Sequence, residues 1–173
     1  SYYGYTKMLW LRDHEPDVWA QTRYFLPPNA YVIYMLTGEI AVDHSSAGNI
    51  GGIYDIAKRD WSDRMLHATG LSREHMPRLV EGSDAAAQLN DTLRREWGIA
   101  NPVLLCGGAG DNAASAIGMG VAEAGSAFLS LGTSGVLFAG TDRFAPNPTQ
   151  AVHAFCHCLP DRWHQMSVIL SAA

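Results

Sequence analysis

Short apolar runs with helical spacing dominate the first hundred positions of the chain. Residues 7–14 and 17–24 predict two short helices separated by a break. The strongly apolar run 30–36 predicts a third helix, which we expect to be buried and to have Asn29 as its N-terminal cap. Gly38 follows as a left-handed stop, because glycine adopts that conformation without strain.

Strand-like patterns interrupt these helices. Residues 39–43 alternate between polar and apolar side chains, which predicts a half-buried strand, and residues 52–56 predict another. Further along, Ser62 is placed to cap a helix that ends at Gly70. This part of the chain is therefore predicted to be mostly helical, with short strands between the helices.

The pattern changes near residue 100. Leu89, Leu93 and Trp97 recur at every fourth position and predict an amphipathic helix with its apolar face in the core. Strand-forming runs separated by glycine turns come next, at 103–106, 126–130, 136–139 and 163–170. We therefore expect an α/β protein of two domains, a mostly helical one over residues 1–99 and a strand-rich one over residues 100–173.

Composition excludes several classes of partner. The 173 residues are 47% hydrophobic, enough for a substantial core, and carry a net charge of −5 with no basic run, so we expect no nucleic-acid partner. The longest apolar runs fall short of the roughly 20 residues that span a bilayer, so we expect no membrane partner. Three cysteines without framework spacing suit a reducing cytoplasm.

One stretch of the second block carries candidate catalytic chemistry. Residues 103–106, followed by glycines at 107, 108 and 110 and then by Asp111, predict a strand, a tight turn and a helix. A carboxylate at a helix N-terminus is favoured in its ionised form, because the helix dipole places about half a positive charge there. Asp111 therefore suits the role of a general base. The alternative is that it only caps its helix.

A second glycine turn suggests the partner for that base. Gly132, Thr133, Ser134 and Gly135 join two predicted strands into a hairpin. Such a turn exposes backbone N–H groups and two hydroxyls, which bind anions without a lysine, although an ordinary hairpin turn has the same composition. Together the two features predict phosphoryl transfer to a hydroxyl whose proton a carboxylate accepts.

Several stretches resemble the FGGY family of carbohydrate kinases. They are GGAGDNAA at 107–114, LSLGTSG at 129–135, VHAFCH at 152–157 and WHQMSVILSAA at 163–173. Upstream, Lys7 followed three residues later by Trp10 resembles the first family signature, and both are expected to pack structurally near the cleft. Gly4 departs from the Ser, Thr or Pro that is usual there. The resemblance spans nearly the whole chain and about the middle third of such an enzyme.

The resemblance implies two ribonuclease-H-like domains of the actin and hexokinase type, with sugar and ATP in the cleft between them. This chain would hold the end of the first domain and the start of the second. Asp111 would be the catalytic base that takes a proton from a sugar hydroxyl, with the C5 hydroxyl of D-xylulose as the expected acceptor. Asn112 and Tyr2 would contact the sugar. The four residues that would face the ATP phosphates are Gly132, Thr133, Ser134 and Gly135.

The family segment Asp-x-Gly-Thr-Ser, which carries the acid that binds Mg²⁺, does not occur in this sequence, and neither does the later adenosine loop. ATP and Mg²⁺ are therefore expected as cofactors, with the metal-binding acid outside the chain and no metal ligands within it. The chain also starts at Ser1 and stops at Ala173 directly after an apolar run. We expect a piece of a longer enzyme that is inactive alone, and a homodimer stays open.

Three alternatives remain beside this hypothesis. The chain could belong to a sister enzyme for another sugar or polyol, or it could be a binding module without catalysis. The third is a zinc site, because both zinc-ligand types cluster at His153, Cys156, His157, Cys158 and His164. Alternation along a strand would turn the histidines at 153 and 157 away from the two cysteines, which argues against a single tetrahedral site.

Overall fold

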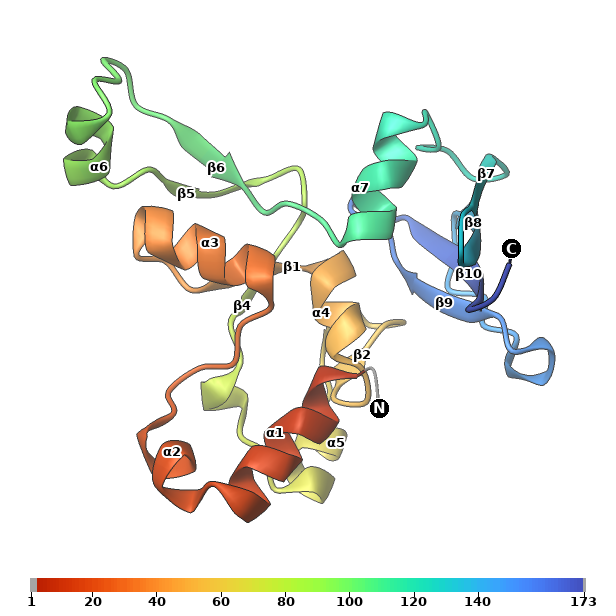
Figure 1. Ribbon diagram of the computed structural model, residues 1–173, viewed down its shortest axis with the longest axis horizontal. Helices are drawn as coiled ribbons and strands as arrows, with labels where there is room; N and C mark the ends of the chain where they lie inside the picture. The colour runs from red at the N-terminus through yellow and green to blue at the C-terminus, as the bar shows by residue number, and fades with distance from the viewer. Residues whose placement is uncertain (1–2, 173) are drawn as a thin grey trace.

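The computed structural model describes residues 3–172 and contains helices and strands close to most of the predicted positions (Figure 1). The helices are α1 (Gly4–His14), α2 (Pro16–Gln21), α3 (Pro28–Thr37), α4 (His44–Ile50), α5 (Asp63–Thr69), α6 (Asp91–Glu96) and α7 (Asp111–Gly118). Two 3₁₀ turns, η1 (Arg73–His75) and η2 (Pro148–Gln150), accompany them. No helix within residues 3–172 has the length and apolar character needed to cross a membrane.

The strands are short in the first half of the chain and longer in the second. They are β1 (Ala41–Asp43), β2 (Tyr54–Asp55), β3 (Asp60–Trp61), β4 (Arg78–Val80), β5 (Ala85–Gln88), β6 (Leu104–Cys106), β7 (Ala127–Leu131), β8 (Gly135–Thr141), β9 (His153–Cys156) and β10 (Trp163–Ile169). β1 pairs in parallel with β4, whereas β2 with β3 and β5 with β6 form antiparallel pairs. The predicted strand at 39–43 is confirmed, but its burial is not partial, because all three residues of β1 are buried.

The helix caps follow the sequence except at α3. Gly38 at a φ of 82° and Gly70 at a φ of 68° end α3 and α5 in the left-handed conformation, and the Ser62 side chain caps α5, all as predicted. The prediction that Asn29 caps α3 was wrong. Pro27 holds the cap position, and the Asn29 side chain instead donates hydrogen bonds to residues of β1 and α4.

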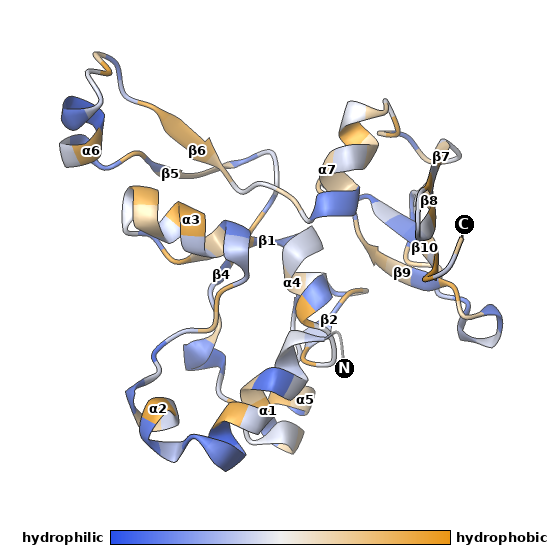
Figure 2. Cartoon of the chain, in the orientation of Figure 1, coloured by the Kyte–Doolittle hydropathy of each residue, from blue (hydrophilic) through white to orange (hydrophobic). Residues whose placement is uncertain are grey.

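Two predictions of burial were also wrong. In α3 only Ala30 and Ile33 are buried, while Tyr31, Val32, Tyr34 and Met35 are each more than 40% exposed. This helix packs against β1 and β5, and its ribbon carries apolar residues beyond the two that are buried (Figure 2). Trp97, expected in the core, is 53% exposed, because α6 stands at the tip of the arm formed by β5 and β6 (Figure 1).

The longer strands form one antiparallel sheet in the order β7-β8-β10-β9. Residues 132–134 connect β7 to β8 as a hairpin turn, and Leu131 faces Gly135 at its base, which confirms the predicted hairpin. β10 lies between β8 and β9, so Met166 faces both Phe138 and His153. Of the residues of β10, His164 is buried, whereas Val168 and Ile169 near its end are exposed.

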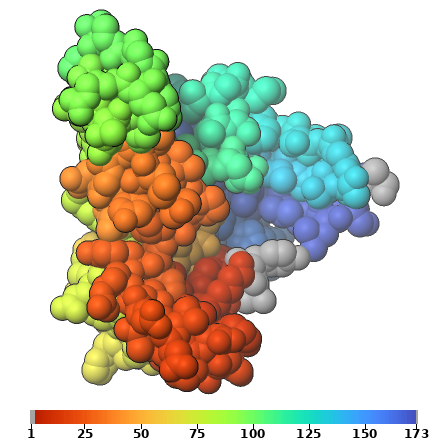
Figure 3. Space-filling model, turned by 60° about the vertical axis from the view of Figure 1, so that its left-hand side comes forward, coloured from red at the N-terminus to blue at the C-terminus, as the bar shows by residue number. Residues whose placement is uncertain are grey.

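The chain forms two lobes that stand side by side, an N-terminal lobe of residues 3–106 and a C-terminal lobe of residues 107–172 (Figure 3). The main core lies in the N-terminal lobe, and Cys156 of β9 belongs to it. The buried residues of this core are Met8, Ala30, Val42, Ala47, Ile50, Ile53, Tyr54, Trp61, Leu66, Leu71, Met76 and Cys156. The C-terminal sheet is therefore docked on the N-terminal lobe through β9, beside α4.

The chain passes from one lobe to the other through closely packed glycines. The Gly107 amide donates to the Asp84 carbonyl (3.0 Å) and the Gly108 amide to the Gly82 carbonyl (3.1 Å). A Cβ atom on Gly82 would lie 2.5 Å from the carbonyl oxygens of Cys158 and Gly108. Three segments meet here backbone to backbone, which no side chain larger than hydrogen permits.

Candidate functional site

Asp111 opens α7 but does not cap it. The cap position belongs to Gly110, and the Oδ1 atom of Asp111 accepts hydrogen bonds from the backbone N–H (2.8 Å) and side-chain amide (3.4 Å) of Asn112. The Asp111 side chain is exposed, and its second oxygen has no hydrogen-bond partner within residues 3–172. The carboxylate thus lies at a helix N-terminus, and one of its oxygens makes no hydrogen bond to residues 3–172.

Asp111 and Asn112 line a cavity of about 670 Å³ between the two lobes. The other lining residues come from α4 (Asn49), from β9 (His153 and Phe155), from β10 (Met166 and Val168) and from segments flanking these elements (Tyr3 and Leu170). This volume lies within the usual range for small-molecule sites, which run from about 300 to 1,000 Å³.

The cavity lining combines polar and apolar side chains. Asp111, Asn112, Asn49, His153 and Tyr3 contribute polar atoms to it, and Phe155, Met166, Val168 and Leu170 contribute apolar side chains. A few convergent polar groups over an apolar surface fix the orientation of a ligand that carries several hydroxyls. Its one acidic side chain, Asp111, is the group able to accept a proton from such a ligand.

The predicted phosphate turn lies beside the C-terminal end of β10, the end that also holds Val168 and Leu170 of the cavity lining. Gly135 faces Ile169 of β10, and the amide of Ala172 donates to the Thr133 carbonyl (2.9 Å). None of Gly132, Thr133, Ser134 and Gly135 lines the cavity, but Leu170, which does, is two residues from Ala172. The Gly132 amide donates to the Ser134 carbonyl (2.9 Å), so this N–H is hydrogen-bonded, whereas the sequence predicted exposed N–H groups in the turn. Thr133 and Ser134 are exposed.

Four members of the cysteine and histidine cluster are buried, whereas His153 is exposed; the buried four are Cys156, His157, Cys158 and His164. β9 ends at Cys156, so strand alternation does not extend to His157 and Cys158. The Cys156 thiol contacts the Tyr54 hydroxyl (3.6 Å), and the Cys158 thiol contacts the Ala113 carbonyl (3.6 Å). Burial raises the pKa of both thiols. Within residues 3–172, no three His, Cys, Asp or Glu side chains gather in a way that could hold a metal ion.

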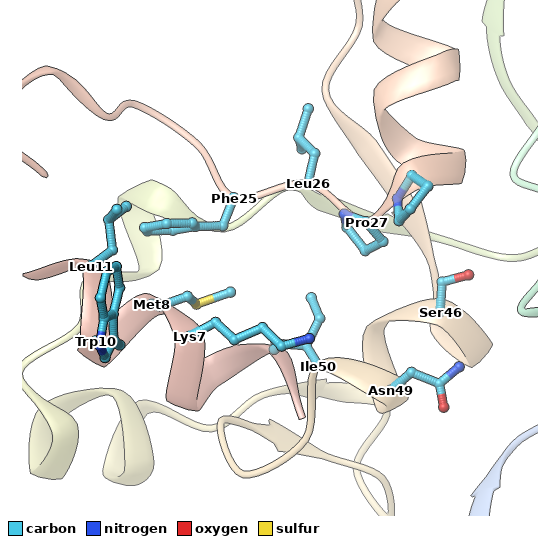
Figure 4. A pocket seen from close by; sticks show the side chains of 12 residues that line it. Lys7, Met8, Trp10, Leu11, Phe25, Leu26, Pro27, Ser46, Asn49 and Ile50 are labelled. Carbon is cyan, nitrogen blue, oxygen red and sulfur yellow. The ribbon is translucent and has the colours of Figure 1, made fainter. Parts of the chain in front are cut away.

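A second pocket, of about 590 Å³, lies between α1 and the segment that leads into α3 (Figure 4). It is lined mainly by apolar side chains, among them Met8, Phe25 and Leu26, and Lys7 and Trp10 stand at its wall. The Trp10 ring is 53% exposed and stacks on His14 with a centroid distance of 5.0 Å. Tyr2, the other residue predicted from this signature, lies outside the described residues.

Asn49 and His153 were missed as site residues in the sequence. The segment around Asn49 has a composition equally consistent with a loop and a short helix, and nothing local marks its side chain for a cavity. His153 lies in the cluster of histidines and cysteines that suggests zinc, so the sequence pointed to metal binding and not to a sugar site. Only the docking of β9 beside α4 places both residues with Asp111.

Known proteins similar to this chain are carbohydrate kinases. The sequence profile described as "FGGY family of carbohydrate kinases, N-terminal domain" matches residues 1–118. The xylulose kinases of Escherichia coli (strain K12) and Klebsiella pneumoniae are 49% and 50% identical to the chain over 172 residues, covering 98% of it and 35% of each relative. The chain thus spans about a third of the length of these curated relatives.

A solved structure with the same arrangement is the "xyloylose kinase" from Brucella ovis, with a TM-score of 0.93, 50% identity, and coverage of 96% of this chain and 34% of that one. The expected fold is thereby confirmed as the ribonuclease-H-like fold of the actin and hexokinase type that FGGY kinases share. Since the family profile also matches more than half of the chain, the chain belongs to the FGGY family of carbohydrate kinases.

Proposed function

We propose that the whole protein transfers a phosphoryl group from ATP to a hydroxyl of D-xylulose, giving D-xylulose 5-phosphate, with Asp111 as the general base. The observation that carries this proposal is the position of Asp111 and Asn112 on the wall of the cavity between the lobes. Identity of about 50% to two xylulose kinases supports the choice of sugar. Sugar and ATP are then its small-molecule partners.

In this mechanism the chain positions the sugar and accepts its proton. The unpartnered oxygen of Asp111 takes the proton of the attacking hydroxyl, while its other oxygen stays bonded to the amide of Asn112. Asn112, together with Asn49, offers amide groups to the remaining hydroxyls, and the apolar side chains of Met166 and Val168 in the cavity lining limit water at the reacting atoms. We assign the ATP phosphates to the turn that contains Thr133 and Ser134.

Mg²⁺ neutralises charge on the ATP phosphates in this type of reaction. We propose that the acid that binds Mg²⁺ belongs to a part of the whole protein outside this chain, as the family resemblance implies. We therefore expect that the 173-residue chain alone does not turn over ATP and D-xylulose. Turnover by the isolated chain at an ordinary enzyme rate in a coupled assay would contradict this expectation.

For the domain boundary we propose a position within residues 107–110 in place of residue 99. β6 pairs with β5, so residues 104–106 are joined to the N-terminal lobe by a strand ladder. The match of the family profile for the N-terminal domain to residues 1–118 supports grouping residues 100–106 with the first block. A cytoplasmic location and a homodimer stay predictions.

The test is Asp111→Asn in the whole protein. Asn is isosteric and keeps the acceptor for the Asn112 amide, so we expect the free energy of unfolding to change by less than about 1 kcal/mol. Loss of the base lowers kcat by roughly 10² to 10⁴ or more. Unchanged kcat in Asp111→Asn would contradict the proposal. A sugar panel with D-xylulose, D-ribulose, L-fuculose, gluconate and glycerol then tests the substrate, and a higher kcat/KM for another sugar would assign the protein to a sister enzyme.

A further inference from the structure

A buried chain of hydrogen bonds joins α4 of the N-terminal lobe to the start of α7. The backbone N–H of Gly110 donates to the Ser45 hydroxyl oxygen at 2.8 Å. The Ser45 hydroxyl in turn donates to the Oδ1 atom of Asp43. Gly110 directly precedes Asp111 and is the N-cap residue of its helix. The backbone beside the proposed base is therefore held by a side chain of the opposite lobe.

The Asp43 carboxylate determines which atoms donate and which accept in this series of hydrogen bonds. Its carboxylate is fully buried and accepts from the amides of Ser45 (2.9 Å) and Ser46 (3.0 Å) and from the side chain of Asn29 (2.9 Å). An ionised carboxylate only accepts hydrogen bonds, so the Ser45 proton must point toward Asp43. A lone pair of Ser45 then remains for the Gly110 amide. Ser45 is only 2% exposed, which leaves its hydroxyl no competing solvent.

The same helix approaches Gly110 at a second point. A Cβ atom on Gly110 would lie 3.0 Å from the Nδ2 atom of Asn49, which lines the cavity together with Asp111. α4 therefore provides both the anchor of the Gly110 backbone and one wall of the site. Its own position is set by Asp43, which caps it, and by the buried core beneath it.

We propose that Ser45, held by Asp43, is a positioning residue that fixes the carboxylate of Asp111 relative to the N-terminal lobe. The inference rests on the proposed function, in which Asp111 is the base. Ser45 does not act on the substrate in this role. It restrains the peptide immediately before Asp111, so that the carboxylate meets the sugar hydroxyl in one orientation, and small misplacements of a reacting group cost large factors in rate.

The test compares Ser45→Ala with Ser46→Ala in the whole protein. Ser46 is the next residue of α4, is similarly buried, and its hydroxyl accepts one hydrogen bond from Asn29 but does not reach Gly110. Both variants lose one buried hydroxyl, so thermal unfolding measures their common loss of stability. We expect Ser45→Ala to lower kcat at least tenfold with KM for ATP within about twofold, while Ser46→Ala keeps kcat within about twofold.

Amide hydrogen exchange tests the anchor without reference to turnover. We expect exchange at Gly110 to rise at least tenfold in Ser45→Ala, to stay unchanged in Ser46→Ala, and to be restored toward the wild-type rate in Ser45→Thr, which returns the hydroxyl. Unchanged exchange at Gly110 in Ser45→Ala would overturn the anchor. Equal losses of kcat in the alanine variants would reduce it to a general stability effect and so overturn the positioning role.

The two proposals fail in different ways. Wild-type turnover in Asp111→Asn overturns the proposed function. Wild-type turnover in Ser45→Ala, beside an inactive Asp111→Asn, leaves the function intact and overturns only the positioning role of Ser45.

Discussion

The guanidinium of Arg59 lies over the ring of Trp163, with 5.5 Å between its central carbon and the ring centroid. Arg59 belongs to the turn between β2 and β3 of the N-terminal lobe, and Trp163 opens β10 of the C-terminal lobe. The same guanidinium donates to Glu81 (2.6 Å), and the Trp163 indole N–H donates to the Ile56 carbonyl (3.0 Å). Charge, aromatic and hydrogen-bond contacts thus join the lobes at one point.

Arg59→Ala should weaken this junction. The Arg59 side chain is 11% exposed, and its loss leaves Glu81 without its closest cation, so we expect the free energy of unfolding to fall by about 2 kcal/mol in urea denaturation. The matched control is Lys58→Ala, since Lys58 is 81% exposed and lies 3.8 Å from Asp55. We expect less than about 0.5 kcal/mol there. An equal decrease in the free energy of unfolding for the two variants would show that the buried contacts of Arg59 do not contribute to stability.

Gly107→Ala should be strongly destabilising. Its Cβ would overlap the Glu81 carbonyl oxygen and lie 2.8 Å from a methyl group of Val80, and the carbonyl belongs to backbone that cannot rotate away. Overpacking of this kind costs about 2–3 kcal/mol. Gly118→Ala is the control, because nothing lies within 4 Å of its Cβ position and the residue is exposed in α7. A midpoint of thermal unfolding that falls no further in Gly107→Ala than in the control would contradict the close approach.

As the pH is lowered below about 6.5, the free energy of unfolding should decrease because of His164. Burial lowers the pKa of His164 to about 3, and its ring is stacked on Phe138 with 4.1 Å between centroids. The unfolded chain takes up a proton near pH 6.5 and the folded chain only near pH 3, so protons favour unfolding throughout that window. The loss is about 1.4 kcal/mol per pH unit once the unfolded histidine is protonated.

The measurement is the urea midpoint of the wild type and of His164→Gln at several values of pH from 7 to 4. Gln cannot ionise, so the variant is expected to lose less stability per pH unit across this range, whatever its stability at pH 7. His157, whose pKa burial also lowers, retains its contribution in both proteins. Parallel pH profiles for the two proteins would show that folded His164 takes up a proton as readily as unfolded His164.

The turn between β7 and β8 provides a test of the ATP assignment. Thr133 and Ser134 present exposed hydroxyls, and a hydrogen bond to a charged phosphate is worth about 1.5–3 kcal/mol. Thr133→Ala and Ser134→Ala in the whole protein should each raise KM for ATP roughly tenfold and leave KM for the sugar unchanged. Thr149→Ala, which removes an exposed hydroxyl bonded to Asn147, is the control. Unchanged KM for ATP in both turn variants would remove this turn from the nucleotide site.

The sequence was sufficient wherever one short-range preference dominates. Gly38 and Gly70 end their helices because only a residue without a Cβ accepts a positive φ at no cost, and Ser62 caps α5 because its hydroxyl reaches an N–H three residues on. Strand runs and their hairpin follow from the same local rules. Asp111 stood out because it follows a glycine-rich turn at a predicted helix start and lies in a stretch that resembles the FGGY kinases.

Contacts between distant segments decided which side chains are buried and which hydrogen-bond partners they have. Asn29 is a residue type that often caps helices, yet α3 begins at Pro28, with Pro27 in the cap position. The Asn29 side chain instead donates hydrogen bonds to Asp43 and Ser46. The apolar residues of α3 would suit a core, but only one face meets other elements of residues 3–172.

The candidate site likewise has features that the sequence predicts and features that only the tertiary structure shows. The sequence by itself determined the family and the place of Asp111 at a helix start, and it suggested Asp111 as the base, because motif residues lie next to one another in the chain. Only the tertiary structure decided that Asn49 and His153 share a cavity with Asp111, and that Ser45, 65 residues before Gly110, holds the peptide beside the base. Such partners are set by how lobes dock, and no local pattern encodes that geometry.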